Sequence, residues 1–456
     1  MQNTRSSFTG KIGFVLAAAG SAVGLGNIWR FPYLANNYGG GLFLLVYIIL
    51  SLTFGFTLMV AEIAIGRKTG LSPLEAFKKL DKRFTFVGYL ATIIPMLILP
   101  YYSVIGGWVM KYAYGFAAGQ DNLMAQEDYF ASYIGSVGEP IGWFLLFIGL
   151  TAAIVMLGVQ KGIEKVSKFM MPVLVVLIIF IAAYSIATMD GAVAGVKYYL
   201  LPNFKGLTAT KLMMTAVAAM GQLFYSMSLA MGIMITFGSY MKKDVNIEKS
   251  THQIEFFDTG IAFLAGLMIV PAVFVFNGGD PEKMNKGAGL MFDTLPKVFD
   301  TMPGGRWIGI IFFVMVFFAA LTSSISLMET IVAVIQDKMK VGRKTACAIV
   351  LGISLVLGLP SALGSSLWAE IKIIGMDFLG FFDFISNSVL MPITALATCI
   401  LVAFIIKPKS VIDEVQLNGR FKQKKMFSFV IRYIAPVFII AILVSSVLEA
   451  FKIIEF

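Results

Sequence analysis

The chain has 456 residues, of which 58% are hydrophobic and only 14% are charged, with a net charge of +10 and a mean hydropathy of +0.84. Soluble domains usually carry about 25% charged residues, and the apolar residues here form long blocks, so the composition excludes an ordinary soluble protein. Cys347 and Cys399 lie inside apolar blocks, which excludes a disulfide framework and a zinc knuckle, and the basic residues form no aromatic-rich patch of the kind that binds nucleic acid.

Eleven apolar segments are long enough to cross a ~30 Å hydrocarbon core, which takes about 20 helical residues. In chain order the predicted spans are residues 12–36, 41–66, 85–116, 140–158, 166–188, 208–239, 254–277, 305–336, 345–361, 375–406 and 427–451. These spans predict an all-α integral membrane protein with 11 transmembrane helices. The single histidine, His252, falls in a predicted loop as a solvated or capping residue, with no second metal ligand nearby.

The orientation follows from the basic residues. Most of the 36 Lys and Arg residues precede the first span or fall in alternate loops, above all in residues 67–83 and 407–425. Cytoplasmic loops carry an excess of Lys and Arg. We therefore expect a multi-pass plasma-membrane protein with a cytoplasmic N-terminus and an extracellular C-terminus, in contact with membrane lipid.

Two spans contain residues that interrupt a helix. The first carries GSAVGLGN at 20–27 and the sixth carries SMSLAMG at 226–232. Glycine costs up to ~1 kcal/mol against alanine in a helix, although small residues also serve close packing of membrane helices. Because each break lies in the first span of a five-span half, the pattern favours a 5+5 inverted repeat with broken helices 1 and 6. The predicted division is a ten-helix core at 1–406, made of repeats 1–190 and 208–406, and then an inner loop and an eleventh helix at 407–456.

Four motifs resemble those of one known family. They are GSAVGLGNIWRFPYLANNYGGGLFLLVY from residue 20, GQLFYSMSL from 221, FFAALTSSIS from 317 and DFISNSV from 383. With these motifs in order, essentially the whole chain resembles the neurotransmitter:sodium symporter family, which has the leucine-transporter fold. The family usually has twelve spans, so eleven resembles its shorter bacterial members. The resemblance implies a transporter and not an enzyme.

The resemblance also implies two sodium sites. The first would use the carbonyls of Gly20, Val23 and Ala319 and the hydroxyls of Thr322 and Ser323. The second would use the Ala22 carbonyl, Asn27, Ser226, Asp258 and the substrate carboxylate. Sodium is a hard cation that prefers oxygen ligands, and inside a membrane these come from unwound backbone and hydroxyls. Without the partner motif, Thr322 and Ser323 would more readily bond back to their own helix.

Asp258 is an acid inside an apolar span, which costs at least ~2.5 kcal/mol and marks a functional candidate. The alternative is an acid near a helix start that faces the cytoplasm, since it lies only a few residues into the predicted span. The resemblance places it where chloride-dependent members have Asn, with uncharged Ala262 one turn on. We therefore predict that no chloride is required and that Asp258 takes up a proton when sodium leaves, which would give proton counter-transport.

The resemblance places the substrate at residues that carry no charge, namely Ala22, Leu25, Gly26, Ile98, Tyr102, Tyr225, Ser228, Met231, Ser323 and Leu327. This lining favours a neutral, hydrophobic L-amino acid, aliphatic or aromatic. Monoamine members carry Asp where this chain has Gly24, which argues against amines. The methyl group of Ala230 would limit substrate bulk whereas Met231 is adaptable. Substrate size therefore stays open, and a small neutral amino acid such as alanine or glycine is the alternative.

The gates also follow from the resemblance. Arg30 and Asp383 would close the outer side, beneath which Tyr225 and Tyr102 would form an aromatic lid. Arg5 and Asp337 would close the inner side, with Phe8, Ser239 and Tyr240 around them and Phe8 replacing the usual Trp. Glu62 would support the unwound backbone. Exposed ion pairs contribute only ~0–1 kcal/mol, which suits gates that open in every cycle.

The leading hypothesis is therefore a sodium-coupled amino-acid symporter that works by alternating access. An ion channel could use the same broken helices to line a pore. An amino-acid sensor would bind without transport, but the chain has no stretch long enough for a signalling domain. No nucleophile–base pair or metal cluster indicates an enzyme. Oligomeric state and sodium stoichiometry cannot be predicted from the sequence.

Overall fold

The computed structural model describes residues 7–280, 284–285 and 287–451, and these form helices with no β-strand among them. The long helical segments are α3 and α4 (Gly41–Leu50 and Phe56–Thr69), α6 (Thr85–Ala117), α9 (Gly138–Met156), α10 (Lys165–Thr188), α14 (Ile247–Phe276), α16 (Gly305–Met339), α17 (Arg343–Leu363), α18 and α19 (Phe378–Asp383 and Met391–Ile400), and α21 and α22 (Lys424–Phe429 and Ala435–Ala450). Nine helical segments within the described ranges are apolar and long enough to cross a membrane.

The first and sixth predicted spans are both broken. The first consists of α1 (Lys11–Ala22), a π-helical turn (Gly26–Arg30) and α2 (Phe31–Asn37), with a bend of 54° at the break. The sixth consists of α12 (Ala209–Ser226) and α13 (Ile233–Ser239). By length and composition, the nine uninterrupted segments and the bent pair of the first span match ten of the predicted spans among the described residues, and α12 with α13 occupies the place of the remaining one. The expected all-α membrane fold with broken helices 1 and 6 is confirmed.

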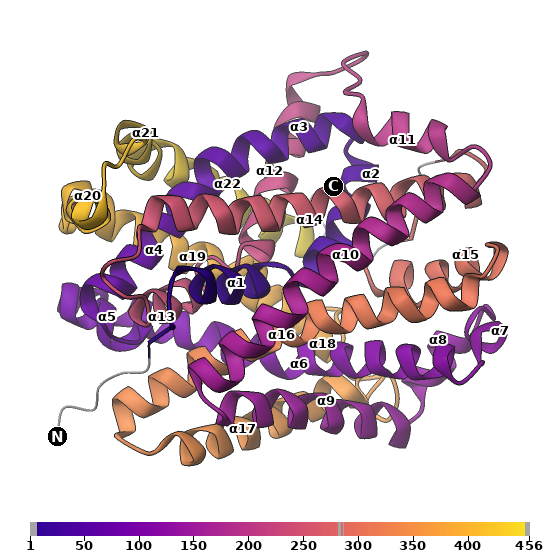
Figure 1. The fold of residues 1–456 in the computed structure, drawn as a ribbon, viewed down its shortest axis with the longest axis horizontal. Helices are drawn as coiled ribbons and strands as arrows, with labels where there is room; N and C mark the ends of the chain where they lie inside the picture. The colour runs from indigo at the N-terminus through magenta and orange to yellow at the C-terminus, as the bar shows by residue number, and fades with distance from the viewer. Residues whose placement is uncertain (1–6, 281–283, 286, 452–456) are drawn as a thin grey trace.

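Shorter helices cap the two ends of the bundle. They are α5 (Pro73–Leu80), α7 (Asp121–Met124), α8 (Tyr129–Gly135), α11 (Ala192–Leu200), α15 (Leu295–Thr301) and α20 (Lys407–Val415). Figure 1 shows α5, α20 and α21 at one end of the long helices and α7, α8, α11 and α15 at the other. The loops predicted as inner and outer thus lie at opposite ends of the molecule.

The start of α14 differs from the sequence prediction. The helix begins at Ile247, not at residue 254, because the Asn246 side chain accepts a hydrogen bond from the Lys249 N–H (2.8 Å) and caps it. The first two turns carry polar residues such as Glu248 and Lys249. Hydropathy marks where the membrane begins and not where the helix begins, so the predicted span began several residues after the start of the helix.

The centre of the bundle is formed by α16, which packs against α6, α10 and α1. It is the most enclosed of the nine long segments, with 72% of its apolar window buried. A helix this enclosed can carry hydroxyl groups only where they find partners. Thr322 and Ser323 lie on it, opposite the break in the first span.

Candidate sodium and substrate site

The first break lies between Ala22 and Gly26. Val23 leaves the helical conformation with φ −79° and ψ 103°, and the chain turns helical again at Gly26. Unwound residues lack the usual intrahelical partners, so their carbonyl and N–H groups are free to contact a ligand. A Cβ on Gly26 would lie 2.4 Å from Tyr225 Cδ1, so glycine lets the two broken segments approach each other.

The second break separates α12 from α13. Ser228, Ala230 and Gly232 have φ values of 53°, 60° and 76°, a left-handed region that costs a non-glycine residue roughly 1–2 kcal/mol. Glu62, buried on α4, accepts a hydrogen bond from the Ala230 N–H through Oε1 (2.7 Å). The Ser228 hydroxyl donates to the Ser21 carbonyl (3.0 Å). Polar side chains thus hold both stretches of unwound backbone.

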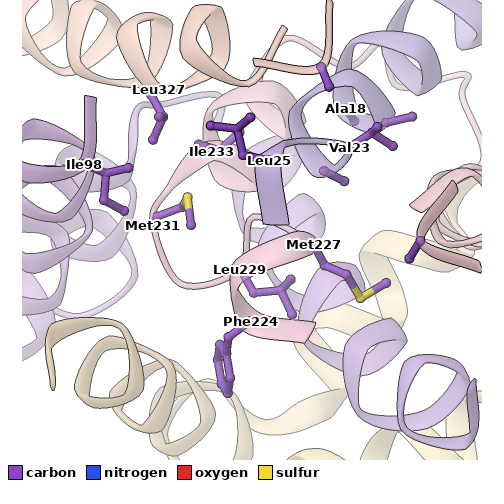
Figure 2. Packing of buried hydrophobic residues seen from close by; sticks show 14 of the residues in the cluster. Ala18, Val23, Leu25, Ile98, Phe224, Met227, Leu229, Met231, Ile233 and Leu327 are labelled. Carbon is purple, nitrogen blue, oxygen red and sulfur yellow. The ribbon is translucent and has the colours of Figure 1, made fainter. Parts of the chain in front are cut away.

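A cavity of about 30 Å³ lies between the two breaks. Its lining contains all ten residues of the predicted substrate site, namely Ala22, Leu25, Gly26, Ile98, Tyr102, Tyr225, Ser228, Met231, Ser323 and Leu327. Figure 2 shows Ile98, Met231 and Leu327 arriving from three different parts of the chain. The Leu25 N–H donates to the Tyr102 hydroxyl (3.3 Å). The volume suits about one water molecule, so the surrounding side chains nearly fill the pocket. Ala230 is not part of the lining.

Carbonyl oxygens of the first break converge on one hydroxyl of α16. Ser323 Oγ lies 3.4 Å from the Gly20 carbonyl, 3.1 Å from that of Ser21 and 3.2 Å from that of Val23. A serine hydroxyl has one proton to donate, and the Ser21 carbonyl already accepts from Ser228. At least one of the Gly20 and Val23 carbonyls therefore remains available to a cation. All five residues are buried.

Thr322 adds a second hydroxyl to the same place. Its Oγ1 lies 2.9 Å from the Phe318 carbonyl and 3.1 Å from the Ala319 carbonyl. This is the bond back to its own helix that a threonine makes without a ligand. A Cβ on Gly20 would lie 3.2 Å from Thr322 Cβ, so α1 and α16 are in close contact here. The structure therefore brings together the five residues predicted for the first sodium site.

The second predicted sodium site is a network around Asp258. Its Oδ1 accepts from Asn27 Nδ2 (2.7 Å), and its Oδ2 lies 3.3 Å from the Tyr47 hydroxyl and 3.4 Å from Ser226 Oγ. These side chains are buried and come from four separate helical segments. Ala22 lines the adjoining pocket. Sequence reasoning missed Tyr47, because a lone tyrosine in an apolar span carries no pattern of its own.

Asp258 is fully buried and lies about three turns inside α14, which begins at Ile247. Its position excludes the alternative of an acid near a helix start that faces the cytoplasm. A buried carboxylate is stable only when paired, hydrogen-bonded or bound to a cation. Here three hydrogen-bonding side chains surround it, and a sodium ion would supply the charge.

The outer gate residues face one vestibule without touching. Within the described ranges no ion pair joins Arg30 to Asp383. The Arg30 guanidinium lies over the Tyr225 ring at 5.6 Å, and Asp383 accepts from the Tyr101 hydroxyl (2.9 Å) and Asn387 Nδ2 (2.6 Å). Both charged residues line a cavity of about 460 Å³. Arg30 and Asp383 therefore do not form the expected ion pair in this arrangement. The cavity that both residues line leaves space for them to approach each other.

The inner gate is only partly visible, because Arg5 lies outside the described residues. Asp337 accepts a hydrogen bond from the Ser72 N–H (2.8 Å). Phe8 is buried, packs edge-on against Tyr240 and donates its N–H to the Tyr240 carbonyl (3.1 Å). The segment before α1 is therefore packed firmly over the inner end of α13.

Behind Tyr240 lies a charged pair that sequence reasoning missed. The Tyr240 hydroxyl donates to Glu329 Oε1 (2.7 Å), and Arg343 donates two hydrogen bonds to the same carboxylate. The neighbouring Ser239 bonds back to the Thr236 carbonyl (2.6 Å). Glu329 is an acid inside an apolar run, which is itself a signal for a functional or paired residue.

The position of His252 differs from the prediction. It lies on α14 and not in a loop, because that helix starts earlier than predicted. Its Nδ1 lies 3.1 Å from Glu255 Oε2, and its ring stacks on Phe56 at 4.5 Å. Across the residues that the structure describes, no group of three His, Cys, Asp or Glu side chains could hold a metal ion.

Comparison with known proteins identifies the family. The model of the sodium:neurotransmitter symporter family matches residues 5–127 and 122–455. The sodium-dependent transporter YhdH of Bacillus subtilis is 37% identical over 96% of both chains, and a sodium-dependent transporter of Haemophilus influenzae is 32% identical over 97% of this chain and 98% of its own. The chain belongs to the sodium:neurotransmitter symporter family. It is a sodium-dependent, multi-pass membrane transporter and not an enzyme.

Among solved structures, this chain is similar to MhsT in complex with L-phenylalanine. The match has a TM-score of 0.87 and 35% sequence identity, and it covers 97% of this chain and 100% of that one.

Proposed function

We propose that this symporter imports a neutral, hydrophobic L-amino acid with two sodium ions, by alternating access and without chloride. The observation that carries the proposal is the uncharged pocket between the two broken helices, with the Asp258 network directly beside it. The N-terminus would be cytoplasmic and the C-terminus extracellular, as the distribution of Lys and Arg favours.

The backbone ends of the two breaks would hold the charged groups of the substrate. Half-helix N-termini carry positive partial charge, so the Leu25 and Gly26 amides and the Tyr102 hydroxyl would bind the carboxylate. Carbonyl groups near Ala22, Tyr225 and Ser228 would bind the ammonium. A substrate carboxylate at the first break would also complete the second sodium site, and this shared contact would couple the amino acid to the ion.

The side-chain end of the pocket is apolar. Ile98, Met231 and Leu327 line it, and the similarity to MhsT, whose structure holds L-phenylalanine, supports a hydrophobic substrate. A biogenic amine is disfavoured, because monoamine members carry Asp where this chain has Gly24. A Cβ at Gly24 would lie 2.7 Å from Ser323 Oγ, so this position has no room for that side chain.

A small neutral amino acid is the second candidate. The volume of about 30 Å³ is too small for a leucine side chain, so a large substrate requires the pocket to expand. Met231 is the residue best suited to move, because its unbranched side chain adapts to different shapes. A substrate such as alanine would need less expansion.

Asp258 would replace chloride. A fixed carboxylate beside the second sodium ion balances the charge that chloride balances in other members. When sodium leaves, the buried carboxylate loses its cation and would bind a proton, since an uncompensated buried charge is costly. The returning transporter would then carry a proton outward.

The test is uptake of labelled leucine, tyrosine, tryptophan and alanine into proteoliposomes under an inward sodium gradient, with gluconate in place of chloride. We expect sodium-driven uptake without chloride, and the rank order of substrates reports pocket size.

Without chloride, the Asp258→Asn variant should transport at least tenfold more slowly than the wild type, because it lacks the fixed negative charge. Added chloride should restore its rate.

Three results would count against the proposal. An Asp258→Asn variant that is equally active without chloride would remove the role given to Asp258. Large ohmic sodium currents without saturable uptake would indicate a channel, and amino-acid binding without any uptake would indicate a sensor.

A further inference from the structure

A groove of about 420 Å³ runs along the outer side of the last membrane helix, where α21 leads into α22. Three basic residues line it, Lys424, Lys425 and Arg432, together with Phe429 and Tyr433. We call it the basic groove. Figure 1 places α21 beside α20, at the end of the bundle predicted to face the cytoplasm.

Among the residues that the structure describes, the three cations of the basic groove form no ion pair, and no carboxylate lines the groove. Arg432 Nε is buried without a hydrogen-bond partner among these residues. A buried donor without an acceptor costs free energy, so this site favours an anionic oxygen that can approach the guanidinium.

A strip of exposed apolar side chains continues from the groove along the same helix. Phe429, Tyr433, Val437, Ile440 and Val444 are 56%, 56%, 65%, 48% and 51% exposed. Their spacing of three or four residues places them on one helix face. In a membrane this face contacts acyl chains, with the aromatic rings at the headgroup level.

We propose that the basic groove binds the phosphodiester headgroup of an anionic phospholipid, whose acyl chains lie along the apolar strip. The cations fit the phosphate, because a guanidinium donates to two oxygens at once and an ammonium acts as a point charge. A free phosphate ion would use the cations alone, whereas a phospholipid also uses the strip. The cations and the apolar strip together therefore favour a membrane lipid as the ligand.

The bound lipid would brace the loop that joins the tenth and eleventh spans. Glu248 at the start of α14 accepts from the backbone N–H groups of Lys422 and Gln423 (3.0 and 3.2 Å), directly before α21. An anchor at Lys424 and Arg432 would hold this contact in place. We expect the lipid to stabilise the folded protein whatever substrate is transported, so the inference does not depend on the proposed function.

The experiment measures thermal unfolding of the purified full-length protein in an uncharged detergent. The additives are dioctanoyl phosphatidylglycerol, dioctanoyl phosphatidylcholine or inorganic phosphate. We expect phosphatidylglycerol alone to raise the unfolding midpoint and to stay bound in native mass spectrometry. Each basic residue at an anionic surface is worth about fivefold in affinity, so changing Lys424, Lys425 and Arg432 together to Gln should weaken binding by roughly a hundredfold.

Lys409→Gln is the matched control, because Lys409 is exposed on the same predicted face but does not line the groove. It should bind like the wild type. If the triple variant does not fold, Arg432→Gln alone should still weaken binding by about fivefold. Equal stabilisation by phosphatidylcholine or by phosphate, or unchanged phosphatidylglycerol binding in the variants, would overturn the proposal.

Discussion

At the scale of single residues, Ala230 combines a strained backbone with a required contact. Its φ of 60° is unfavourable for a residue with a Cβ, by roughly 1–2 kcal/mol, yet its N–H must point at Glu62 Oε1. The hydrogen bond needs the unwound backbone and not the methyl group. The strain is therefore separable from the contact.

We expect Ala230→Gly to raise the thermal unfolding midpoint in detergent. Glycine removes the left-handed penalty, which outweighs its greater freedom in the unfolded chain and leaves a gain of up to about 1 kcal/mol. Ala194→Gly is the control, because Ala194 is exposed in the regular helix α11 and the change there should cost about 1 kcal/mol. Equal losses in both variants would show that Ala230 is not strained.

At the scale of elements, a buried ion pair fixes the loop before the last span. Arg67 at the end of α4 donates through Nε to Glu414 Oε1 on α20 (2.8 Å), and through one terminal nitrogen to the Val245 carbonyl (2.6 Å). The two side chains are 1% and 7% exposed. Three elements that are distant in the sequence are thus tied together at one end of the bundle.

We expect Glu414→Gln to destabilise the protein by about 3 kcal/mol, because it leaves the Arg67 charge buried without a counter-charge. The measurement is the shift of the unfolding midpoint in detergent. Glu75→Gln is the matched control, since the Glu75–Lys78 pair (3.9 Å) is largely exposed and should contribute at most about 1 kcal/mol. Similar shifts in both variants would contradict the role given to the buried pair.

Elements were predictable from the sequence to different degrees. The membrane spans were predicted to within a few residues, because lipid requires long apolar helices. The start of α14 was missed, since its polar turns lie outside the apolar run. The ten substrate residues could be listed because they sit in two recognisable motifs and on the helices facing them. Tyr47 and the separation of Arg30 from Asp383 depend on packing and on the conformational state, which no local pattern encodes.

At the scale of the whole molecule, the proposed cycle determines how much net charge crosses the membrane in each turnover. Two sodium ions in, one zwitterionic amino acid in and one proton out transfer one net positive charge. A tenfold sodium gradient is worth ~1.4 kcal/mol per ion, and one charge at 100 mV is worth ~2.3 kcal/mol. The cycle therefore has about 5 kcal/mol available, against about 7 kcal/mol if no proton leaves.

A pH gradient separates these two cycles. One pH unit is worth 1.36 kcal/mol for a transported proton, so making the interior one unit more acidic should raise the equilibrium accumulation of the amino acid about tenfold if one proton leaves per substrate. The measurement is the steady-state ratio of labelled substrate in proteoliposomes at a fixed sodium gradient and potential. Asp258→Asn with chloride present should accumulate substrate equally at every pH gradient, because its site has no proton to carry. A wild-type ratio that ignores the pH gradient would exclude proton counter-transport while leaving sodium symport intact.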